Sequence, residues 1–313
     1  MSMKLKLLLF LCIAGLDVEA QQDALYSQYM FNPFAVNPAY AGSRSSYSAV
    51  FLYRYQWTNI PGAPKTGTFA IHAPATKMNL IWGLNAGVDA MGPQSCTNAA
   101  ATLGYRINLK KSKLSFALRG GIISTNFNYG LLNFNDLNDP FDIGGQSQRV
   151  TRPSFDFGTY WYGKKFYLGL AVNHITTYKI AFTEDTMSGT SLPPLEGLKL
   201  RRHFFLGGGL VFDLKPNFVL KPSMLIKYAD GSIPNVDLNV NALIYKRLWL
   251  GISARSSRSL VFLMDLNITD FLRIGYAFDY SLKLFSYTRG SHEWFLGFDF
   301  NLKKSNVVSP RYL

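Results

Sequence analysis

The chain has 313 residues, of which 48% are hydrophobic, 15% aromatic and 16% charged, against about 25% charged residues in an average soluble protein. This length suits one large domain or two ordinary ones. The formal net charge of +13 comes from dispersed basic residues, which argues against nucleic acid as a partner and leaves an anionic membrane surface or acidic partners.

The first twenty residues predict export. Two lysines precede an apolar run from Leu7 to Leu16, and the segment ends at the small residue Ala20. A basic start, a short apolar stretch and a small final residue are typical of a secretory signal peptide. The run is too short to cross a bilayer as a helix, so we interpret residues 1–20 as a signal peptide that is removed on export.

An aromatic segment with two Asn-Pro pairs follows. Residues 29–43 read YMFNPFAVNPAYAGS. Proline fixes φ and has no N–H to donate, so neither a helix interior nor a core strand suits this segment. We therefore predict that residues 21–45 form an ordered, non-strand entry to the strands that follow. Its candidate contact residues are Tyr29, Phe31, Asn32, Pro33, Phe34, Asn37, Pro38 and Tyr40.

Alternation with a period of two dominates residues 46–301. In the stretch VDLNVNALI, for example, Leu238 and Val240 alternate with the polar Asp237 and Asn239. A water-soluble sandwich and a membrane barrel share this pattern, because the barrel only turns the apolar face outward. We predict about fourteen strands of membrane-spanning length. They lie near residues 46–57, 66–72, 80–90, 97–109, 114–128, 154–162, 166–176, 202–213, 218–228, 235–244, 248–256, 259–267, 271–282 and 291–301.

The lengths of the connections favour an all-β, antiparallel transmembrane barrel in the bacterial outer membrane, surrounded by its lipid. Tight connections alternate with longer ones, as short periplasmic turns alternate with long extracellular loops in such barrels. An even number of strands then places both termini in the periplasm, with residues 302–313 as a periplasmic tail. The tight connections are 110–113, 163–165, 214–217, 245–247 and 269–270, and the longer ones are 58–65, 129–153, 177–201 and 283–290.

Aromatic residues gather near the predicted strand ends. We interpret them as the two girdles at the membrane interfaces, with ordinary sheet packing as the alternative. They are Tyr53, Tyr55, Trp57, Tyr160, Trp161, Tyr162, Phe204, Phe205, Trp249 and Trp294.

Charged residues of both signs occupy the small, polar face, which lines the lumen of a barrel. Such charges must be paired with one another or be in contact with water. We weigh a self-neutralising lattice of salt bridges against a water-filled path or a cradle for a partner segment. In this lumen or its periplasmic mouth, the N-terminal segment would be a plug or a partner contact. The lumen candidates are Arg54, Arg106, Arg119, Lys221, Arg255, Arg273, Asp156, Asp237, Asp265, Asp279 and Asp299.

The sequence offers no motif for catalysis or for a cofactor. The four histidines are scattered, and no zinc, phosphate-loop, dinucleotide or nucleophile-elbow pattern occurs. We expect no catalytic residue, no cofactor and no metal site. An outer-membrane hydrolase built on a serine stays an alternative, because such triads are defined by geometry rather than sequence order. For Cys96, the single cysteine left after export, we weigh a partly buried thiol against a reactive one.

Three stretches taken together resemble the PorP/SprF family. They are QDALYSQYMFNPFAVNPAYAGS, RYQWTNIPGAPKTGTFAIHAP and WGLNAGVDAMGPQS. The resemblance implies an outer-membrane barrel tied to the type IX secretion system and to gliding motility. It also implies a large secreted partner, such as an adhesin with a C-terminal type IX secretion domain, and other type IX components. It supplies no catalytic residues.

The predicted function is therefore a non-enzymatic role in the export or surface anchoring of a type IX substrate. The alternative is a diffusion porin or apolar-solute transporter of similar architecture. The state of the lumen discriminates between the two, because an open channel conducts ions and a plugged one does not.

Overall fold

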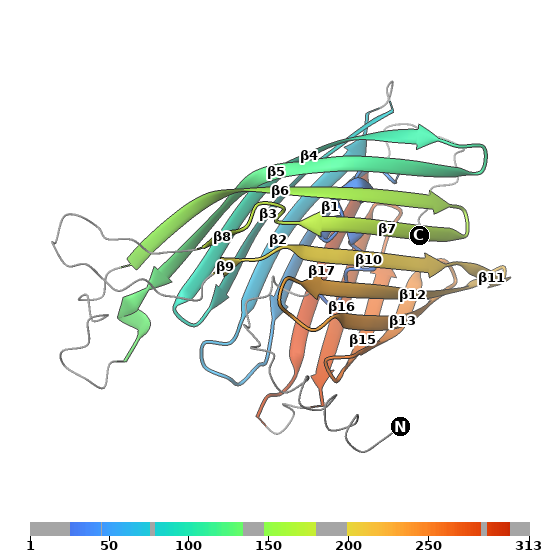
Figure 1. The fold of residues 1–313 in the computed structure, drawn as a ribbon. Coiled ribbons are helices and arrows are strands. Elements are labelled where there is room, and N and C mark those ends of the chain that lie inside the picture. Colours follow the sequence, from blue (N-terminus) through green and yellow to red (C-terminus); the bar gives the residue numbers. More distant parts are fainter. Residues whose placement is uncertain are drawn as a thin grey trace, which may run out of the picture.

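Fourteen antiparallel strands form one closed barrel in the computed structural model, which describes residues 26–44, 46–75, 79–133, 147–179, 199–282 and 287–300 (Figure 1). The predicted signal peptide and the predicted C-terminal tail lie outside the described residues. Strand β1 pairs with β17, and β10 pairs with β12, so the sheet has no open end. Segments β10 and β11 are two parts of one strand, divided at Val211.

The strands match the predicted ranges within a few residues, except that β6 begins earlier. They are β1 (Tyr47–Tyr55), β2 (Lys65–Pro74), β3 (Leu80–Met91), β4 (Gln94–Asn108), β5 (Ser112–Asn128), β6 (Ser147–Gly163), β7 (Phe166–Asn173), β10 (His203–Leu210), β11 (Phe212–Lys215), β12 (Phe218–Ala229), β13 (Asn235–Ile244), β14 (Leu248–Arg255), β15 (Ser259–Asn267), β16 (Leu272–Ser281) and β17 (Ser291–Phe300). A small hairpin pairs β8 (Tyr178–Lys179) with β9 (Lys199–Leu200). The 3-10 helices are η1 (Pro33–Ala35), η2 (Pro38–Tyr40) and η3 (Tyr129–Leu131).

The large apolar face of the strands points outward. Leu238 and Val240 on β13 are 57% and 51% exposed, whereas Asp237 and Asn239 between and beside them are 0% and 2% exposed. An apolar exterior around a polar interior is the arrangement of a membrane barrel, not of a water-soluble sandwich. The prediction of a transmembrane barrel is confirmed. None of the helices in the described part of the chain is long and apolar enough to cross a membrane.

The two rims of the barrel differ in their connections. At one rim, where β2, β4, β6, β11, β13, β15 and β17 end, the connections are two to five residues long; we call it the short-turn rim. At the other, where β1, β3, β5, β7, β12, β14 and β16 end, the connections include residues 56–64, 129–146, 174–202 and 282–290; we call it the long-connection rim. The alternation of short and long connections therefore matches the prediction.

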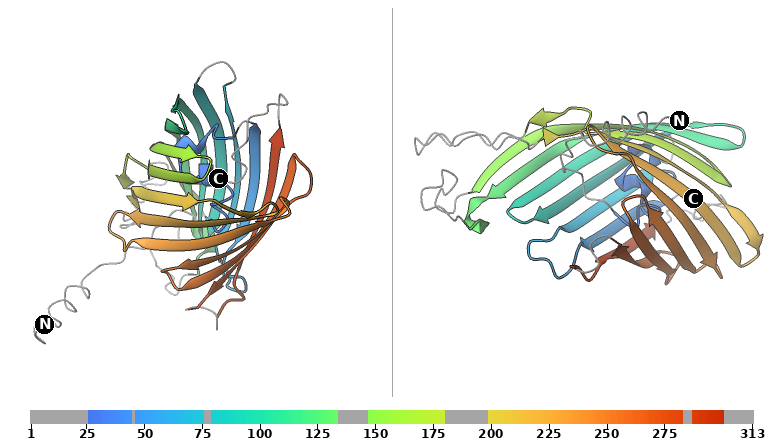
Figure 2. Two further views of the ribbon diagram at one scale, coloured as in Figure 1. Left: turned by 90° about the vertical axis from the view of Figure 1, so that its right-hand side faces the viewer. Right: turned by 60° about the horizontal axis from the view of Figure 1, so that its bottom comes forward.

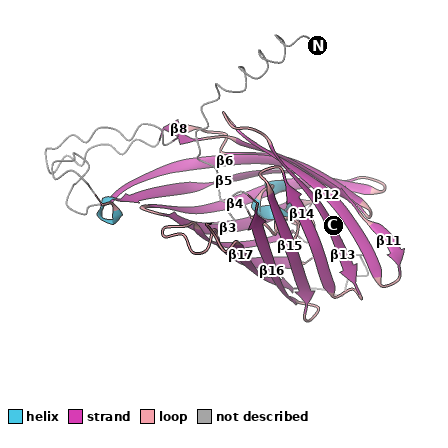
Figure 3. Cartoon of the chain, turned by 90° about the horizontal axis from the view of Figure 1, so that it is seen from below, coloured by secondary structure: helices cyan, strands magenta, loops and turns pink. Residues whose placement is uncertain are grey.

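Residues 26–44, which we call the N-terminal segment, lie inside the barrel. Both helices of this segment are enclosed by the strands when the barrel is seen from its end and from below (Figures 2 and 3). Nearly all of its residues are buried. The lumen therefore holds the stretch of chain that precedes the first strand.

The described ends of the chain lie at opposite rims. Tyr26 contacts Arg255, the last residue of β14, at the long-connection rim. Phe300 ends β17 at the short-turn rim. The even strand count predicts both termini on one side; the true termini lie outside the described residues, and the described ends lie at opposite rims. The even strand count fixes where the first strand begins, but not where the segment before it runs.

Candidate functional site

The N-terminal segment owes its local structure to its two Asn-Pro pairs. Pro33 and Pro38 each occupy the first position of a 3-10 helix, where the missing N–H costs nothing. Asn37 caps η2, because its side-chain oxygen accepts a hydrogen bond of 2.9 Å from the backbone N–H of Ala39. The local form of the segment thus follows from its own residues.

Asn37 also joins the segment to the barrel wall. Its Nδ2 donates to the carbonyl oxygens of Thr159 (2.9 Å) and Leu170 (3.3 Å), on β6 and β7. Two glycines make room for it. A Cβ on Gly158 would lie 2.2 Å from the Asn37 Oδ1, and a Cβ on Gly169 would lie 2.8 Å from its Nδ2. The wall is therefore shaped around this side chain.

The four predicted aromatic anchors are all buried, and three of them lie against inward-facing rings. The ring of Phe34, which is fully buried, lies 5.1 Å from that of His72, and Tyr40 lies 5.5 Å from the same ring. Phe31 lies 6.1 Å from Trp249. Such contacts between aromatic rings each stabilise a fold by about 0.5–1.5 kcal/mol beyond area burial.

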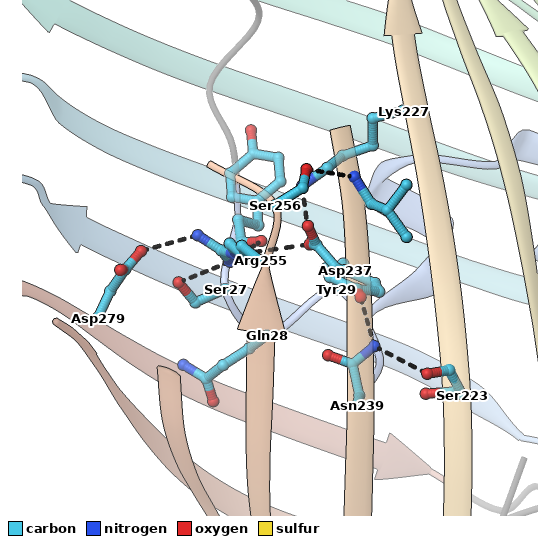
Figure 4. Close-up of polar contacts among 12 residues, drawn as sticks. Ser27, Gln28, Tyr29, Ser223, Lys227, Asp237, Asn239, Arg255, Ser256 and Asp279 are labelled. Atoms are coloured by element: carbon cyan, nitrogen blue, oxygen red, sulfur yellow. Dashed lines mark hydrogen bonds and ion pairs between the residues drawn. The ribbon is translucent and has the colours of Figure 1, made fainter. Parts of the chain in front are cut away.

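The fourth anchor, Tyr29, meets the wall through its hydroxyl (Figure 4). The Nδ2 of Asn239 on β13 donates to the Tyr29 hydroxyl at 2.6 Å. This hydrogen bond joins the start of the segment to β13.

A cluster of six charged side chains lies beside the start of the segment, near the long-connection rim. We call it the long-rim cluster; it comprises Arg54, Lys227, Asp237, Arg255, Asp279 and Glu293. Its three cations and three carboxylates balance, as buried charges must. All six are buried. The cluster is therefore neutral as a unit.

Glu293 ties this cluster to the N-terminal segment. Its carboxylate accepts hydrogen bonds from the backbone N–H groups of Ser27 and Gln28, both at 2.7 Å. Arg54 bridges the two parts, since it donates to the Ser27 hydroxyl (2.6 Å) and pairs with Glu293 (3.2 Å). Charge-assisted hydrogen bonds of this kind are among the strongest in proteins.

Arg255 extends the same network toward β13 (Figure 4). It pairs with Asp279 at 2.7 Å and with Asp237 at 3.4 Å, and it donates to the Ser27 hydroxyl at 3.1 Å. Lys227 completes the cluster through a contact of 2.8 Å to Asp237.

A second cluster holds the other end of the segment near the short-turn rim. In this short-rim cluster, Arg44 contacts both oxygens of Asp299, at 3.0 and 2.8 Å. Arg273 pairs with Asp299 at 3.3 Å and with Asp265 at 3.6 Å. Burial opposes the charge of Arg44, but Asp299 outweighs it, so the pKa of the guanidinium lies above its ordinary value.

Arginines between the clusters reach the backbone of the segment. Arg119 pairs with Asp156 on the wall and donates to the carbonyl oxygen of Phe34 at 3.2 Å. Arg106 donates to the carbonyl oxygen of Gly42 at 2.9 Å. Lys221 lies over the ring of Tyr167, 5.1 Å from its centroid. All eleven candidate lumen charges thus face the interior, and nine of them form ion pairs among the described residues.

Several residues at the site were absent from the sequence-based candidates. Ser27, Gln28 and Arg44 lie outside any strand and carry no pattern that marks them. Glu293, by contrast, shares its face of β17 with Phe295 and Asp299, so alternation alone places it in the lumen.

The aromatic girdles were only partly predicted. Tyr53, Trp161, Phe204 and Trp294 lie on the outer face. Four others point inward, contrary to the prediction: Tyr160, Tyr162, Phe205 and Trp249. The reason is the period of the strand, because neighbours such as Tyr160 and Trp161 must face opposite sides.

The nearest approach to catalytic geometry is a serine–histidine contact. The Ser154 Oγ lies 2.8 Å from the Nδ1 of His174. The nearby Asp156 accepts from the backbone N–H of His174 and pairs with Arg119, so it does not orient the imidazole as the acid of a triad does. Among the residues described, no group of three or more His, Cys, Asp or Glu side chains could hold a metal ion. Cys96 is half-buried.

Comparison with known proteins gives a family and a fold. A sequence profile described as "Type IX secretion system membrane protein PorP/SprF" matches residues 18–298. No curated protein matches the chain significantly. The family is one of secretion-system membrane proteins, and the likeness to solved structures shows the fold of an outer-membrane barrel.

Solved outer-membrane barrels resemble the structure at low sequence identity. The Ralstonia pickettii toluene transporter TbuX superposes with a TM-score of 0.50 at 9% identity, over 84% of this chain and 92% of that chain. The Acinetobacter baumannii outer membrane protein Omp33 has a TM-score of 0.48 at 10% identity, over 83% and 100%. The translocator domain of the autotransporter NalP from Neisseria meningitidis has 0.44 at 12% identity, over 95% and 94%. The likeness to TbuX shows a shared fold and no more.

Proposed function

Because the chain belongs to the PorP/SprF family of type IX secretion system membrane proteins, we propose that it supports the export or surface anchoring of a large secreted protein. The proposed partner is a surface protein, such as an adhesin of the kind used in gliding motility, that carries a C-terminal type IX secretion domain. Other type IX components would join the complex. The barrel acts as a binding platform and not as an enzyme.

The observation that carries this proposal is the occupied lumen. A diffusion porin needs a continuous water path through the barrel. Here the N-terminal segment fills the interior and is fixed near both rims, by Glu293 at one and by Asp299 at the other. A barrel that is filled and rigid suits a protein that binds others at its rim rather than one that passes solutes.

The N-terminal segment itself is better suited to plug the barrel than to contact a partner. Phe34 and Tyr40 are almost fully buried. The side chain of Asn37 is hydrogen-bonded to the barrel wall and to Ala39. Little of this segment is left for another protein to touch. In the proposal, residues 26–44 stabilise the barrel, and the partner binds elsewhere.

The proposal includes an orientation. Short turns face the periplasm in barrels of this kind, so the short-turn rim would lie inside and the long-connection rim outside. Residues 1–20 would direct export, residues 46–301 would form the barrel, and residues 302–313 would follow β17 into the periplasm.

A gentle-detergent pull-down from the native outer membrane tests the proposal. Tagged protein is recovered and the bound proteins are identified by mass spectrometry. We expect one large secreted protein or type IX components to be recovered with the barrel. The purified barrel is also placed in a planar bilayer, where we expect no steady open-channel conductance.

The opposite result would favour a porin or transporter. If the barrel is recovered alone, reproducibly and in good yield, and if it conducts ions steadily, the platform function fails. A control in both measurements is an unrelated tagged barrel from the same membrane, which should not recover the same secreted protein.

A further inference from the structure

Strand β6 has an edge that no described strand covers. It pairs with β5 along its whole length, from Ser147 to Gly163, but with β7 only from Phe157 to Tyr162. The chain leaves β7 after Asn173, whereas β6 continues past it toward the long-connection rim (Figure 1). Within the described residues, no strand forms a ladder with the other side of Ser147–Pro153. Tyr178 of β8 and Leu200 of β9 lie close to Arg152, but their hairpin is a separate sheet.

The backbone groups of this edge alternate between the two sides of the strand. The carbonyl oxygen of Phe155 accepts from the N–H of Ile175 at 2.8 Å, so Phe155 directs its backbone groups away from β5. Because the direction alternates along an antiparallel strand, every second residue before Phe155 also directs its backbone groups away from β5. Ser147, Arg149 and Thr151 therefore offer N–H and C=O groups to the open side. Pro153, which has no N–H, falls in this series, where a strand tolerates proline.

The open edge lies beyond the membrane. On the outer face of β6, Phe157 and Phe155 are followed by Thr151 and Arg149, so the surface changes from apolar to polar toward the rim. The facing residue on β5 changes likewise, since Ser124 lies opposite Thr151 and bonds to it at 3.0 Å. A polar outer face belongs in water rather than in lipid.

Length explains why this part of the sheet projects. Strands β5 and β6 have 17 residues each, whereas β14 on the other side has 8. A membrane-spanning strand needs about 9–11 residues. The excess therefore stands above the membrane at the long-connection rim.

We propose that the edge Ser147–Pro153 of β6 is a docking site that accepts an extended, acidic segment of the exported partner as an added strand. This inference rests on the proposed function. An exposed edge supplies the main-chain donors and acceptors by which extended peptides are commonly bound. Three N–H and four C=O groups point to this side over seven residues, and the Thr151 C=O also accepts from Arg152.

Charge selects the occupant. Arg149 and Arg152 are both exposed, and among the described residues neither pairs with a carboxylate. Arg152 donates instead to the carbonyl oxygen of Thr151, at 3.3 Å. A second copy of this chain would bring the same two arginines against them, and like charges facing each other across a ladder are destabilising. An acidic segment of another protein would instead place carboxylates opposite the two arginines, which stabilises the pairing.

Two sets of variants test the edge. In the first, Ser147→Pro, Arg149→Pro and Thr151→Pro together remove all three N–H donors, and the matched control carries Ala at the same positions and keeps them. In the second, Arg149→Glu with Arg152→Glu keeps every N–H but reverses the charge. The readout is the amount of the secreted protein recovered with each variant in the pull-down, relative to wild type. Folding is checked by heat-modifiable migration of the barrel.

We expect the proline variant to recover at least about tenfold less partner than the alanine variant, because several main-chain hydrogen bonds are lost together. We expect the charge-reversed variant to lose partner also. Equal recovery by wild type and a folded proline variant overturns the inference. If the proline variant does not fold, undiminished recovery by the charge-reversed variant overturns it. If wild type recovers no secreted protein, the proposed function fails instead.

Crosslinking identifies what binds. A photo-crosslinking amino acid is placed at Arg149 on the open edge, and a control at Thr97, which lies on the outer face of β4, two strands away. We expect a crosslink from position 149 to an acidic stretch of the secreted protein and none from position 97. A crosslink from position 149 to a second copy of this chain would overturn the proposed occupant.

Discussion

Glu293 is the residue that should matter most for holding the N-terminal segment. Its buried carboxylate accepts both backbone N–H groups of Ser27 and Gln28. In Glu293→Gln, the new amide NH₂ group would face one of these N–H donors and could not accept its hydrogen bond. Arg54 would also lose its ion pair with residue 293. Breaking a buried ion pair costs about 3–5 kcal/mol. We expect a lower unfolding temperature and cleavage by chymotrypsin within residues 26–34, which are protected in the wild type.

A surface pair of the same protein provides the control. Lys165 and Asp213 lie 3.9 Å apart, and their side chains are 70% and 58% exposed. Surface pairs contribute about 0–1 kcal/mol, so Asp213→Asn should leave both the unfolding temperature and the cleavage pattern near those of the wild type. If Glu293→Gln behaves in the same way, this carboxylate does not hold the segment.

Sequence patterns predict which residues face the lumen, but not which of them meet. Alternation placed Arg119 and Asp156 on the inner face, and their pairing follows only from the register of β5 against β6. Ser27 and Glu293 are 266 residues apart, so their contact depends on the path of the N-terminal segment. No local pattern contains that path.

Packing of the N-terminal segment against the wall gives a prediction for an element. A Cβ on Gly158 would lie 2.2 Å from the Asn37 Oδ1, closer than any real contact allows. We expect Gly158→Ala to push η2 out of place and to destabilise the barrel by about 1–3 kcal/mol, the usual cost of overpacking. Thermal unfolding in detergent measures this shift.

The matched control is Gly67→Ala on β2. There the nearest atom to a new Cβ belongs to Tyr53, at 4.0 Å, which is an ordinary contact. Its unfolding temperature should stay close to that of the wild type. Equal stability of the two variants would mean that η2 moves freely, and then Asn37 does not fix the segment.

The form of the N-terminal segment was easier to predict than its position. Two prolines in six residues exclude a strand, because each lacks a ladder donor. They also occupy the first positions of η1 and η2, which the sequence analysis did not specify. The position depends on cavities left by residues such as Gly83 and Gly158, which come from distant strands. A glycine within a strand does not reveal what fills the space it leaves.

At the scale of the whole molecule, the features that were predictable are those set by the geometry of the strands and their connections. Strand number and antiparallel order followed from alternation and from the lengths of the connections. Alternation alone did not separate a barrel from a sandwich, because that depends on which face meets water. The closing contact of β1 with β17 joins positions about 240 residues apart, and it is the step that places both clusters inside one lumen.

The path of the N-terminal segment gives a prediction for the side of the membrane on which its first described residue lies. The segment crosses the lumen from Arg44 near the short-turn rim to Tyr26 near the long-connection rim. If short turns face the periplasm, Tyr26 lies at the rim that faces the outside of the cell. In a Cys96→Ser background, we expect Tyr26→Cys to react with a membrane-impermeant maleimide on intact cells. Ser257→Cys, in an exposed turn of the same rim, should react as well.

Lys164→Cys at the short-turn rim completes this experiment. Lys164 is exposed in the connection between β6 and β7, so its cysteine should react only after the outer membrane is opened. Reaction of Ser257→Cys without Tyr26→Cys on intact cells would mean that position 26 is enclosed within the lumen. Reaction of Lys164→Cys alone would reverse the orientation of the barrel and would place the open edge of β6 in the periplasm. The rim that reacts on intact cells therefore decides whether partner capture at that edge happens outside the cell or in the periplasm.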